Sequence, residues 1–276
     1  MYRVFANGAK IPAIGFGTYG MARPEMLRMI PAALKGGFRH IDTAQIYRNE
    51  AEVGECIASC GIPRSELFVA TKVWVANYPE SRFGASVDES LRKLRSDYID
   101  LLLLHWPHES VPLTEQIGLL NETVRAGKVR HIGVSNFNRQ LLDQAIGLSA
   151  VPLVTNQFEY HPYLNQSLLA DATRKAGLAV TAYCAMAIGR VLTDPTIAEI
   201  AESHGRTIPQ VVLRWLLQQD DVVALSRTTN PDRIVENLTV FDFELDEDEM
   251  ATIQTLARPD SRIVNPSGLA PVWDAS

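Results

Sequence analysis

The chain alternates between short apolar stretches and longer amphipathic ones, and this alternation limits its possible folds more than any other feature. Eight stretches are predicted to be β-strands: 14–17, 39–42, 68–72, 99–105, 131–135, 154–159, 179–184 and 222–226. Helices are predicted at 24–35, 50–59, 81–94, 113–126, 140–148, 167–176, 195–204, 209–218, 233–239 and 246–255. Strands and helices in regular succession are typical of a parallel sheet with helical crossovers.

One strand–helix unit shows the pattern clearly. Residues 99–104 read Ile-Asp-Leu-Leu-Leu-Leu, a nearly continuous apolar run expected of a parallel strand covered on both faces. The helix that follows places its apolar residues on one face, at Leu113, Ile117, Leu120 and Val124. Eight such units without a linker predict an α/β fold, a (β/α)8 TIM barrel in which residues 1–276 form a single domain.

Two glycine patterns near the start of the chain need separate interpretations. Asn7-Gly8 between short apolar runs predicts an N-terminal β-hairpin with a type I′ turn. Residues 15–20 match the G-x-G-x-x-G pattern of dinucleotide-binding domains, and Asp42 lies at a suitable distance beyond it. No helix opens at these glycines, however, and eight units exceed the six strands of a doubly wound sheet. The glycines are therefore expected to form a flexible loop at the barrel mouth.

Polar residues stand where many of the predicted strands end. They are Asp42, Lys72, His105, Ser135, Gln157, Tyr183 and Arg227, with Tyr47 in the loop after the second strand. The carboxyl ends of the strands of such a barrel meet on one face, where active sites are built. Barrel packing favours branched aliphatic residues instead, so this set indicates a site.

The residue types suggest proton transfer to an oxygen. A phenol titrates near 10, and an adjacent ammonium lowers that value, so Lys72 is expected to make Tyr47 a better acid. Asp42 can hold Lys72 by an ion pair, and His105 can orient a carbonyl oxygen beside the phenol. No side chain can donate a hydride, so a reduction here requires a cofactor.

Composition excludes several other classes of function. The net charge of −6 argues against a nucleic-acid or anionic-membrane surface. No apolar run is long enough to span a membrane, and the start of the chain does not resemble a signal peptide. Cys56, Cys60 and Cys184 suggest neither a disulfide framework nor a metal site, and Cys56 and Cys60 are expected to be buried thiols. A cytoplasmic protein is expected.

Six motifs in order resemble the aldo-keto reductases over essentially the whole chain. They are Gly37-Phe-Arg-His-Ile-Asp-Thr-Ala-Gln-Ile-Tyr47, Thr71-Lys-Val-Trp74, Asp100-Leu-Leu-Leu-Leu-His-Trp-Pro107, Gly133-Val-Ser-Asn-Phe137, Asn156-Gln-Phe-Glu-Tyr-His-Pro162 and Arg233-Ile-Val-Glu-Asn237. The resemblance implies a barrel that reduces aldehydes or ketones with NADPH and has no Rossmann domain. It implies that Asp42, Tyr47, Lys72 and His105 form the catalytic tetrad, with Tyr47 as general acid.

The resemblance also assigns binding residues. Ser135, Asn136 and Gln157 would hold the nicotinamide carboxamide and Tyr183 would stack on its ring. The other cofactor positions implied are Gly17, Thr18, Asp42, Arg227, Thr228, Arg233, Glu236 and Asn237. The substrate would meet Trp74, His105 and Trp106, with Tyr19 and Trp273 as further candidates for an aromatic wall. A monomer acting on a small carbonyl compound is expected, with no metal.

The short loops and the segment 268–274 are similar to bacterial 2,5-diketo-D-gluconate reductases of the B type, such enzymes often being methylglyoxal reductases as well. Two departures from the family pattern stand out. Ser226-Arg227-Thr228 replaces Pro-Lys-Ser, which keeps a cation for a 2′-phosphate. The segment 183–189 replaces Tyr-Ser-Pro-Leu, which leaves open how tightly this loop covers the pyrophosphate.

Two rival functions remain open at this point. One is a regulatory or structural protein that keeps the fold and binds the cofactor without turnover. The other is a sugar or phosphate-ester isomerase on the same barrel, which would not explain Arg227 and Arg233 together with Tyr183.

Overall fold

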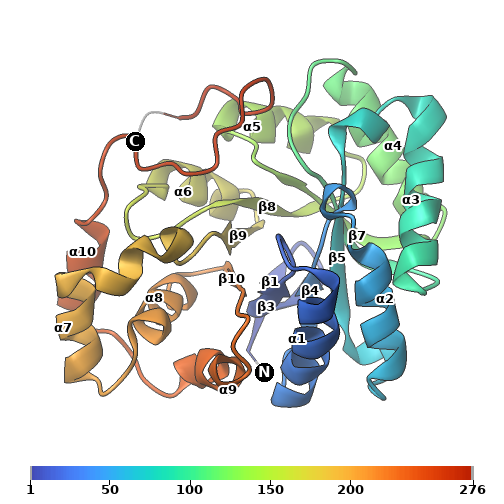
Figure 1. Ribbon diagram of the computed structural model, residues 1–276. Coiled ribbons are helices and arrows are strands. Elements are labelled where there is room, and N and C mark those ends of the chain that lie inside the picture. The colour runs from blue at the N-terminus through green and yellow to red at the C-terminus, as the bar shows by residue number, and fades with distance from the viewer. Residues whose placement is uncertain (1, 275–276) are drawn as a thin grey trace.

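The computed structural model describes residues 2–274 and forms a closed eight-stranded parallel barrel inside a ring of helices (Figure 1). The barrel order is β10-β3-β4-β5-β6-β7-β8-β9. The strands are β3 Ile14–Gly17, β4 His40–Asp42, β5 Phe68–Val73, β6 Ile99–Leu104, β7 Val129–Ser135, β8 Leu153–Glu159, β9 Ala179–Tyr183 and β10 Val222–Ser226. The predicted TIM barrel is confirmed, and every predicted strand exists with ends that differ by at most two residues.

The helices lie outside the barrel: the first eight lie in connections between successive strands, and the last two follow β10. They are α1 Arg23–Gly36, α2 Glu50–Ser59, α3 Glu80–Leu94, α4 Leu113–Arg125, α5 Arg139–Leu148, α6 Ser167–Lys175, α7 Pro195–Ser203, α8 Ile208–Leu217, α9 Asp232–Leu238 and α10 Glu247–Gln254. Several begin at side-chain caps: Asn138, Asp194 and Asp246 each accept a hydrogen bond from a backbone N–H of the first turn. Helix α1 ends at Gly37, whose φ of 119° favours glycine.

The N-terminal hairpin closes the end of the barrel where the strands begin. Strands β1 Arg3–Ala6 and β2 Ala9–Pro12 pair antiparallel, and Asn7 and Gly8 have φ of 44° and 89°, as the predicted type I′ turn requires. Asn7 Nδ2 also donates to the carbonyl oxygen of Leu153 at 2.7 Å, which ties the turn to the barrel. Apolar residues of the hairpin pack with the barrel interior, so the barrel is filled rather than open.

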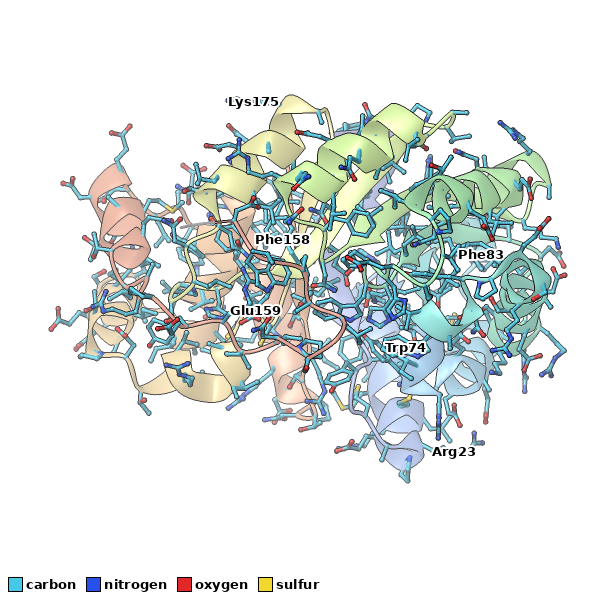
Figure 2. All side chains as sticks on the ribbon, turned by 90° about the horizontal axis from the view of Figure 1, so that it is seen from above. Arg23, Trp74, Phe83, Phe158, Glu159 and Lys175 are labelled. Carbon is cyan, nitrogen blue, oxygen red and sulfur yellow. The ribbon has the colours of Figure 1, made fainter. Side chains whose placement is uncertain are left out.

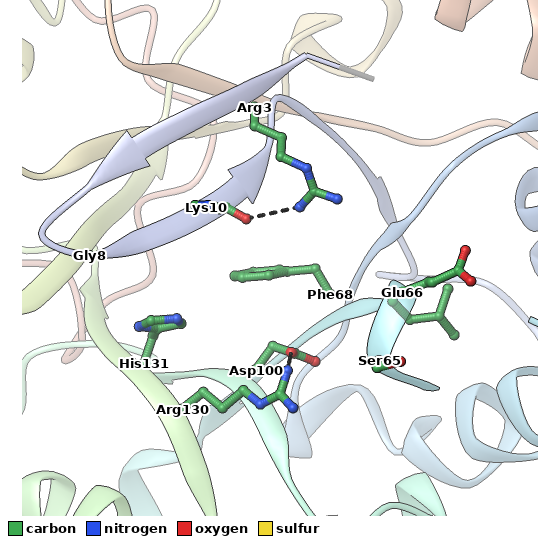
Figure 3. A pocket seen from close by; sticks show the side chains of 10 residues that line it. Arg3, Gly8, Lys10, Ser65, Glu66, Phe68, Asp100, Arg130 and His131 are labelled. Atoms are coloured by element: carbon green, nitrogen blue, oxygen red, sulfur yellow. Dashed lines mark hydrogen bonds and ion pairs between the residues drawn. The ribbon is translucent and has the colours of Figure 1, made fainter. Parts of the chain in front are cut away.

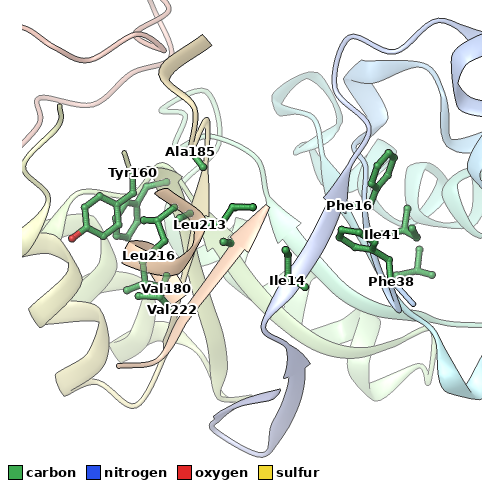
Figure 4. Packing of buried hydrophobic residues seen from close by; sticks show 14 of the residues in the cluster. Ile14, Phe16, Phe38, Ile41, Tyr160, Val180, Ala185, Leu213, Leu216 and Val222 are labelled. Atoms are coloured by element: carbon green, nitrogen blue, oxygen red, sulfur yellow. The ribbon is translucent and has the colours of Figure 1, made fainter. Parts of the chain in front are cut away.

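The helix-facing sides of the strands form the larger core. Figure 4 shows Phe16 and Phe38 beside Ile14 and Ile41 on one side of the barrel. The rings of Phe16 and Phe38 meet edge to face, with centroids 5.7 Å apart. This packing surrounds β4 and so fixes the strand that carries Asp42.

Gly15 and Gly17 fall both in the predicted strand 14–17 and in the predicted flexible loop; the strand is confirmed and the loop is wrong, and several short 3-10 turns were not predicted. Gly15 and Gly17 lie within β3 rather than in a loop. A Cβ on Gly15 would approach Leu225 Cδ2 to 2.7 Å and His40 Nδ1 to 2.8 Å, so close packing explains this glycine. Only Gly20, with φ of 70°, belongs to the loop at the mouth. Tyr47 ends a 3-10 turn, Gln45–Tyr47, rather than lying in an irregular loop.

A hollow of about 250 Å³ lies beside the hairpin, at the end of the barrel where the strands start (Figure 3). Asp100 in its lining forms an ion pair with Arg130, also in the lining, at 3.3 Å and one with the adjacent Arg64 at 2.7 Å, and its carboxylate accepts the N–H of Val69. These contacts connect neighbouring strands, so the hollow is part of the structural base. No helix within residues 2–274 is long and apolar enough to cross a membrane.

Candidate active site

Four polar side chains meet where the strands of the barrel end. Asp42 is the last residue of β4, Lys72 lies near the end of β5, and His105 follows β6 directly. Tyr47 reaches the same place from the 3-10 turn after β4. The structure thus brings together the four residues that the sequence suggested for catalysis.

Lys72 and Asp42 form a buried ion pair. Lys72 Nζ lies 2.6 Å from Asp42 Oδ1 and 2.8 Å from the carbonyl oxygen of Thr43, and the two side chains are 1% and 4% exposed. Burial lowers the pKa of Lys72, and the adjacent carboxylate raises it in part. Each charge therefore depends on the other, since an isolated charge at this depth would be strongly disfavoured.

Tyr47 lies among aromatic and charged neighbours. Its ring meets those of Tyr19 and His105 at centroid distances of 5.0 and 5.7 Å, and Lys72 Nζ lies 5.2 Å from its ring centroid. Burial raises the pKa of Tyr47 well above 10, and the charge of Asp42 adds to this. The expected lowering by Lys72 does not prevail, because the ammonium is engaged by Asp42 and burial dominates. Tyr47 is consequently a protonated phenol at neutral pH.

His105 is a neutral imidazole beside that phenol. Burial, followed by the charge of Lys72, lowers its pKa well below 6.5. Its Nδ1 is buried and has no hydrogen-bond partner among residues 2–274. The ring of Trp74 lies 5.4 Å from it. A neutral imidazole of this kind can donate one hydrogen bond to a carbonyl oxygen.

A hydrogen-bonded platform extends from the ion pair across the barrel mouth. Gln157 Nε2 donates to Asp42 Oδ2 at 2.9 Å, and Ser135 Oγ donates to the carbonyl oxygen of Gln157 at 2.9 Å. Asn136, with φ of 64°, donates to the carbonyl oxygen of His105 and accepts from Tyr183 Oη at 2.7 Å. The four residues expected to hold a nicotinamide thus form one surface beside the tetrad.

The residues expected at the other end of the cofactor follow β10. Arg227 and Arg233 are exposed, and Arg227 Nη2 donates to the carbonyl oxygen of Gly20 at 3.2 Å. Asn237 Nδ2 donates to Ser226 Oγ, whereas its buried Oδ1 has no donor within the described part of the chain. Two guanidinium groups suit a phosphate, and the free amide oxygen suits an amino group. This end of the site fits an adenosine phosphate.

Three other residues assigned to the cofactor have mainly structural contacts. Thr18 is buried, and its hydroxyl donates to the carbonyl oxygen of Asp42 at 3.0 Å. Thr228 Oγ1 caps the turn at Asn230 by accepting its N–H. Glu236 accepts a hydrogen bond from the hydroxyl of Thr207. Gly17, beside Asp42 in the parallel register, leaves space at the barrel mouth.

An aromatic wall borders the tetrad. Trp74 is half-buried and Trp106 is buried, and the backbone of Trp106 is held by Tyr78, whose hydroxyl donates to its carbonyl oxygen at 2.7 Å. Trp273 meets Trp106 with ring centroids 6.5 Å apart, and Tyr19, whose ring meets that of Tyr47, is 70% exposed. Figure 2 shows Trp74 in the view from above.

Sequence reasoning did not identify the function of Glu159, although it lies within a quoted motif. Its buried carboxylate accepts hydrogen bonds from the backbone N–H of Ile263 and of Val264, both at 2.7 Å, and contacts His161 Nε2 at 2.8 Å. Burial acts to raise its pKa, but these hydrogen bonds prevail and the pKa is lowered. The contacts fix the C-terminal segment over the barrel mouth near Glu159 (Figure 2). The sequence signal that could have identified Glu159 is a polar residue at the end of a predicted buried strand.

The loop after β9 has an unusual backbone. Cys184, Ala187 and Ile188 have φ of 59°, 46° and 50°, a region that residues other than glycine rarely adopt. The side chain of Ile188 is 74% exposed. The sequence of this loop departs from the family pattern, and these three residues adopt left-handed backbone conformations.

Neither thiol chemistry nor a metal cluster is apparent near the tetrad. Cys56 is buried as expected, whereas Cys60 is half-buried and its thiol donates to the carbonyl oxygen of Ile57. Burial raises the pKa of Cys184 to about 11. Within the described residues, no three His, Cys, Asp or Glu side chains are placed to hold a metal ion.

Comparisons with known proteins agree with this geometry. The model of the Aldo/keto reductase family matches residues 13–258. The methylglyoxal reductase DkgB of Salmonella typhi is 40% identical over 267 residues, covering 96% of this chain and 99% of that protein. The morphine 6-dehydrogenase of Pseudomonas putida is 42% identical over 283 residues, covering 96% and 95%. A crystal structure named for 2,5-diketo-D-gluconic acid reductase B superposes with a TM-score of 0.98 at 58% identity, covering 100% and 98%.

Proposed function

The chain belongs to the aldo/keto reductase family of carbonyl-reducing oxidoreductases, and from this we propose that it reduces small aldehydes or ketones with NADPH, using Tyr47 as the general acid. The observation that carries the proposal is the convergence of a protonated phenol, a neutral imidazole and a buried ion pair at one rim. Methylglyoxal and 2,5-diketo-D-gluconate, which the names of its relatives mention, are the first substrates to test.

The chain's own residues would act on the carbonyl oxygen. His105 donates a hydrogen bond to that oxygen and orients it toward Tyr47. As the oxygen gains negative charge, Tyr47 gives it the phenolic proton. Lys72, 5.2 Å from the ring centroid, then stabilises the phenolate, while Asp42 keeps the ammonium charged and in place. Trp74 and Trp106 exclude water from the reacting atoms.

The cofactor would lie on the platform beside the tetrad. Ser135, Asn136 and Gln157 would hold the carboxamide and Tyr183 the ring face. NADPH bound in this way would supply a hydride to the carbonyl carbon. Arg227 and Arg233 would bind the 2′-phosphate, with Thr228, Glu236 and Asn237 near the adenosine. The fit of the exposed guanidiniums and of the free Asn237 oxygen supports this placement.

Steady-state oxidation of NADPH, followed by its absorbance, tests the proposal. The wild-type protein is expected to consume NADPH with methylglyoxal and with other small aldehydes, forming one alcohol for each NADPH oxidised. A protein that binds NADPH but consumes none with a broad carbonyl panel would instead be a regulatory or structural member of the fold. A protein whose tryptophan fluorescence is not quenched by NADPH would exclude both the reductase and the regulatory or structural cofactor-binding protein.

A further inference from the structure

Arg262 is a charged residue at the barrel mouth that the proposed chemistry does not use. It lies in the C-terminal segment, directly before the two residues held by Glu159. The residue is half-buried, and its Nη1 is fully buried with no acceptor anywhere in residues 2–274. Guanidinium N–H groups buried without a partner are costly, so this nitrogen is suited to an acceptor from outside the chain.

The guanidinium is held in one orientation by the aromatic wall. Its carbon lies 3.6 Å from the ring centroid of Trp273, a stacked cation–π contact. Trp273 in turn meets Trp106, which directly follows His105 in the chain. The indole nitrogen of Trp273 donates to Asn265 Oδ1 at 2.9 Å, which fixes this ring within the same segment. Arg262 is thereby connected to the substrate wall through two indole rings.

Arg262 also interacts electrostatically with Tyr183 of the platform expected to hold the cofactor. Its charge lies close enough to Tyr183 to lower the pKa of that phenol, although burial outweighs this and raises it overall. Tyr183 bonds Asn136, and Asn136 bonds the backbone of His105. Arg262 is thus linked by its charge to the residue expected to stack on nicotinamide, and by its contact with Trp273 to the wall expected to face the substrate.

The nearby carboxylates do not neutralise Arg262 directly. Glu159 uses both oxygens for Ile263, Val264 and His161, and Asp274 Oδ2 accepts the N–H of Arg139. Neither forms an ion pair with Arg262 within 4.0 Å in the described chain. Burial lowers the pKa of Arg262, in the direction expected for a charge that lacks a close partner.

Resting on the proposed function, we propose that Arg262 binds a carboxylate on the carbonyl substrate, so that the preferred substrates are anionic aldehydes or ketones. The carboxylate would occupy the acceptor position at Nη1 while the carbonyl group lies over Tyr47. Arginine suits this role because its planar fork binds carboxylates bidentately and stays charged. Glu159 is a positioning residue here, since it fixes the backbone on which Arg262 stands.

A matched pair of substrates tests this assignment. Succinic semialdehyde and butanal share the same aldehyde and chain length, and differ in a terminal carboxylate or methyl group. With NADPH, the wild-type protein is expected to show a kcat/KM at least about tenfold higher for succinic semialdehyde, mainly through a lower KM. Arg262→Met should lose about tenfold or more on succinic semialdehyde and about threefold or less on butanal.

Two further variants separate recognition from structural support. Arg262→Lys keeps the positive charge and should retain part of the preference for succinic semialdehyde. Arg139→Met removes an exposed arginine at the other end of the tail contact and should leave the preference unchanged. Calorimetric binding of 4-hydroxybutanoate to the NADP+-loaded protein should weaken by about tenfold in Arg262→Met, which gives a readout without turnover.

The outcomes are distinguishable from failure of the proposed function. If the wild-type protein reduces butanal but shows no higher kcat/KM for succinic semialdehyde, the assignment of Arg262 is overturned while the proposed carbonyl reduction stands. Equal losses on both substrates in Arg262→Met, with unchanged binding of 4-hydroxybutanoate, would show that Arg262 only supports the tail. If circular dichroism shows that Arg262→Met does not fold, Arg262→Lys and the binding data decide. The assignment would be overturned if Arg262→Lys kept the full wild-type preference for succinic semialdehyde and the wild-type protein showed no binding of 4-hydroxybutanoate.

Discussion

Gln157 donates its side-chain amide to Asp42 Oδ2 at 2.9 Å, while Lys72 holds the other oxygen, Oδ1, at 2.6 Å. One buried carboxylate therefore joins the platform proposed to hold the cofactor to the ammonium beside Tyr47. Because Asp42 accepts a hydrogen bond on each oxygen, its carboxylate is held in one orientation. Changes on either side of this carboxylate are expected to affect the other.

Removal of the Lys72 ammonium should impair both chemistry and stability. Lys72→Met leaves Asp42 as a buried charge without its counterion, a loss of about 3–5 kcal/mol in the free energy of unfolding. The uncompensated carboxylate should raise the pKa of Tyr47 further, because Asp42 already acts in that direction. Turnover should fall, and the alkaline limb of the pH–rate profile for carbonyl reduction, where Tyr47 must be protonated, should move to higher pH. Unchanged limbs in a folded variant would show that Lys72 does not act on Tyr47.

Cofactor choice should depend on the cations after β10. Arg227→Ala is expected to raise the dissociation constant of NADPH by about tenfold or more, because a charge-assisted hydrogen bond contributes about 1.5–3 kcal/mol. NADH lacks the 2′-phosphate and should be little affected. Quenching of tryptophan fluorescence measures both, with Arg125→Ala on the surface of α4 as the control. Equal losses would instead indicate that Arg227 supports the Gly20 loop, to which it is already bonded.

Acid should destabilise the barrel through its buried histidines. Burial lowers the pKa of His40, and its Nε2 has no partner in residues 2–274. Because the unfolded chain binds this proton more readily than the folded chain, neutral His40 contributes stability that is fully present above about pH 6.5. This stability is lost as the pH falls toward the pKa of His40 in the folded protein, by at most about 1.4 kcal/mol per pH unit. Urea unfolding at several pH values should give a smaller slope of the free energy of unfolding against pH for His40→Gln than for wild type. A slope equal to that of wild type would exclude His40 as a contributor.

The tail should detach when its acceptor is weakened. Glu159→Gln turns one oxygen into a donor facing the N–H of Ile263 or Val264, at a cost of about 1.5–3 kcal/mol. Hydrogen exchange at these two amides should therefore accelerate by about tenfold or more. Glu202→Gln, on the exposed side of α7, is the control. Unaltered protection at 263–264 would mean that other contacts hold the segment.

The sequence was sufficient to predict the barrel, and to predict that Asp42, Tyr47, Lys72 and His105 meet at its mouth, because both depend on local order along the chain. A nearly continuous apolar strand such as β6 indicates parallel pairing, and the residue that ends each strand lies at the mouth of the barrel. The state of Tyr47 was not accessible in the same way. Its raised pKa follows from burial and from the engagement of Lys72 by Asp42, which only three-dimensional distances reveal.

The C-terminal segment marks the other limit of the sequence. Glu159 and Ile263 are far apart in the chain, and no periodic pattern connects a strand end to a tail without helix or strand. Arg262 reads as an ordinary surface charge until its stacking on Trp273 and its unpartnered nitrogen are seen. Gly15 likewise resembled part of a binding loop until the positions of Leu225 and His40 showed that a side chain has no space there.

The proton donor is the centre of the proposed function, and Tyr47→Phe tests it most directly. This change removes one oxygen from a half-buried ring that forms no protein hydrogen bond within the described residues, so folding and NADPH affinity should be preserved. Single-turnover reduction of methylglyoxal by pre-bound NADPH, followed by stopped-flow absorbance, should slow by about a hundredfold or more relative to wild type. A folded Tyr47→Phe protein that binds NADPH normally and reduces methylglyoxal at a near-wild-type rate would contradict the assignment of Tyr47 as the acid.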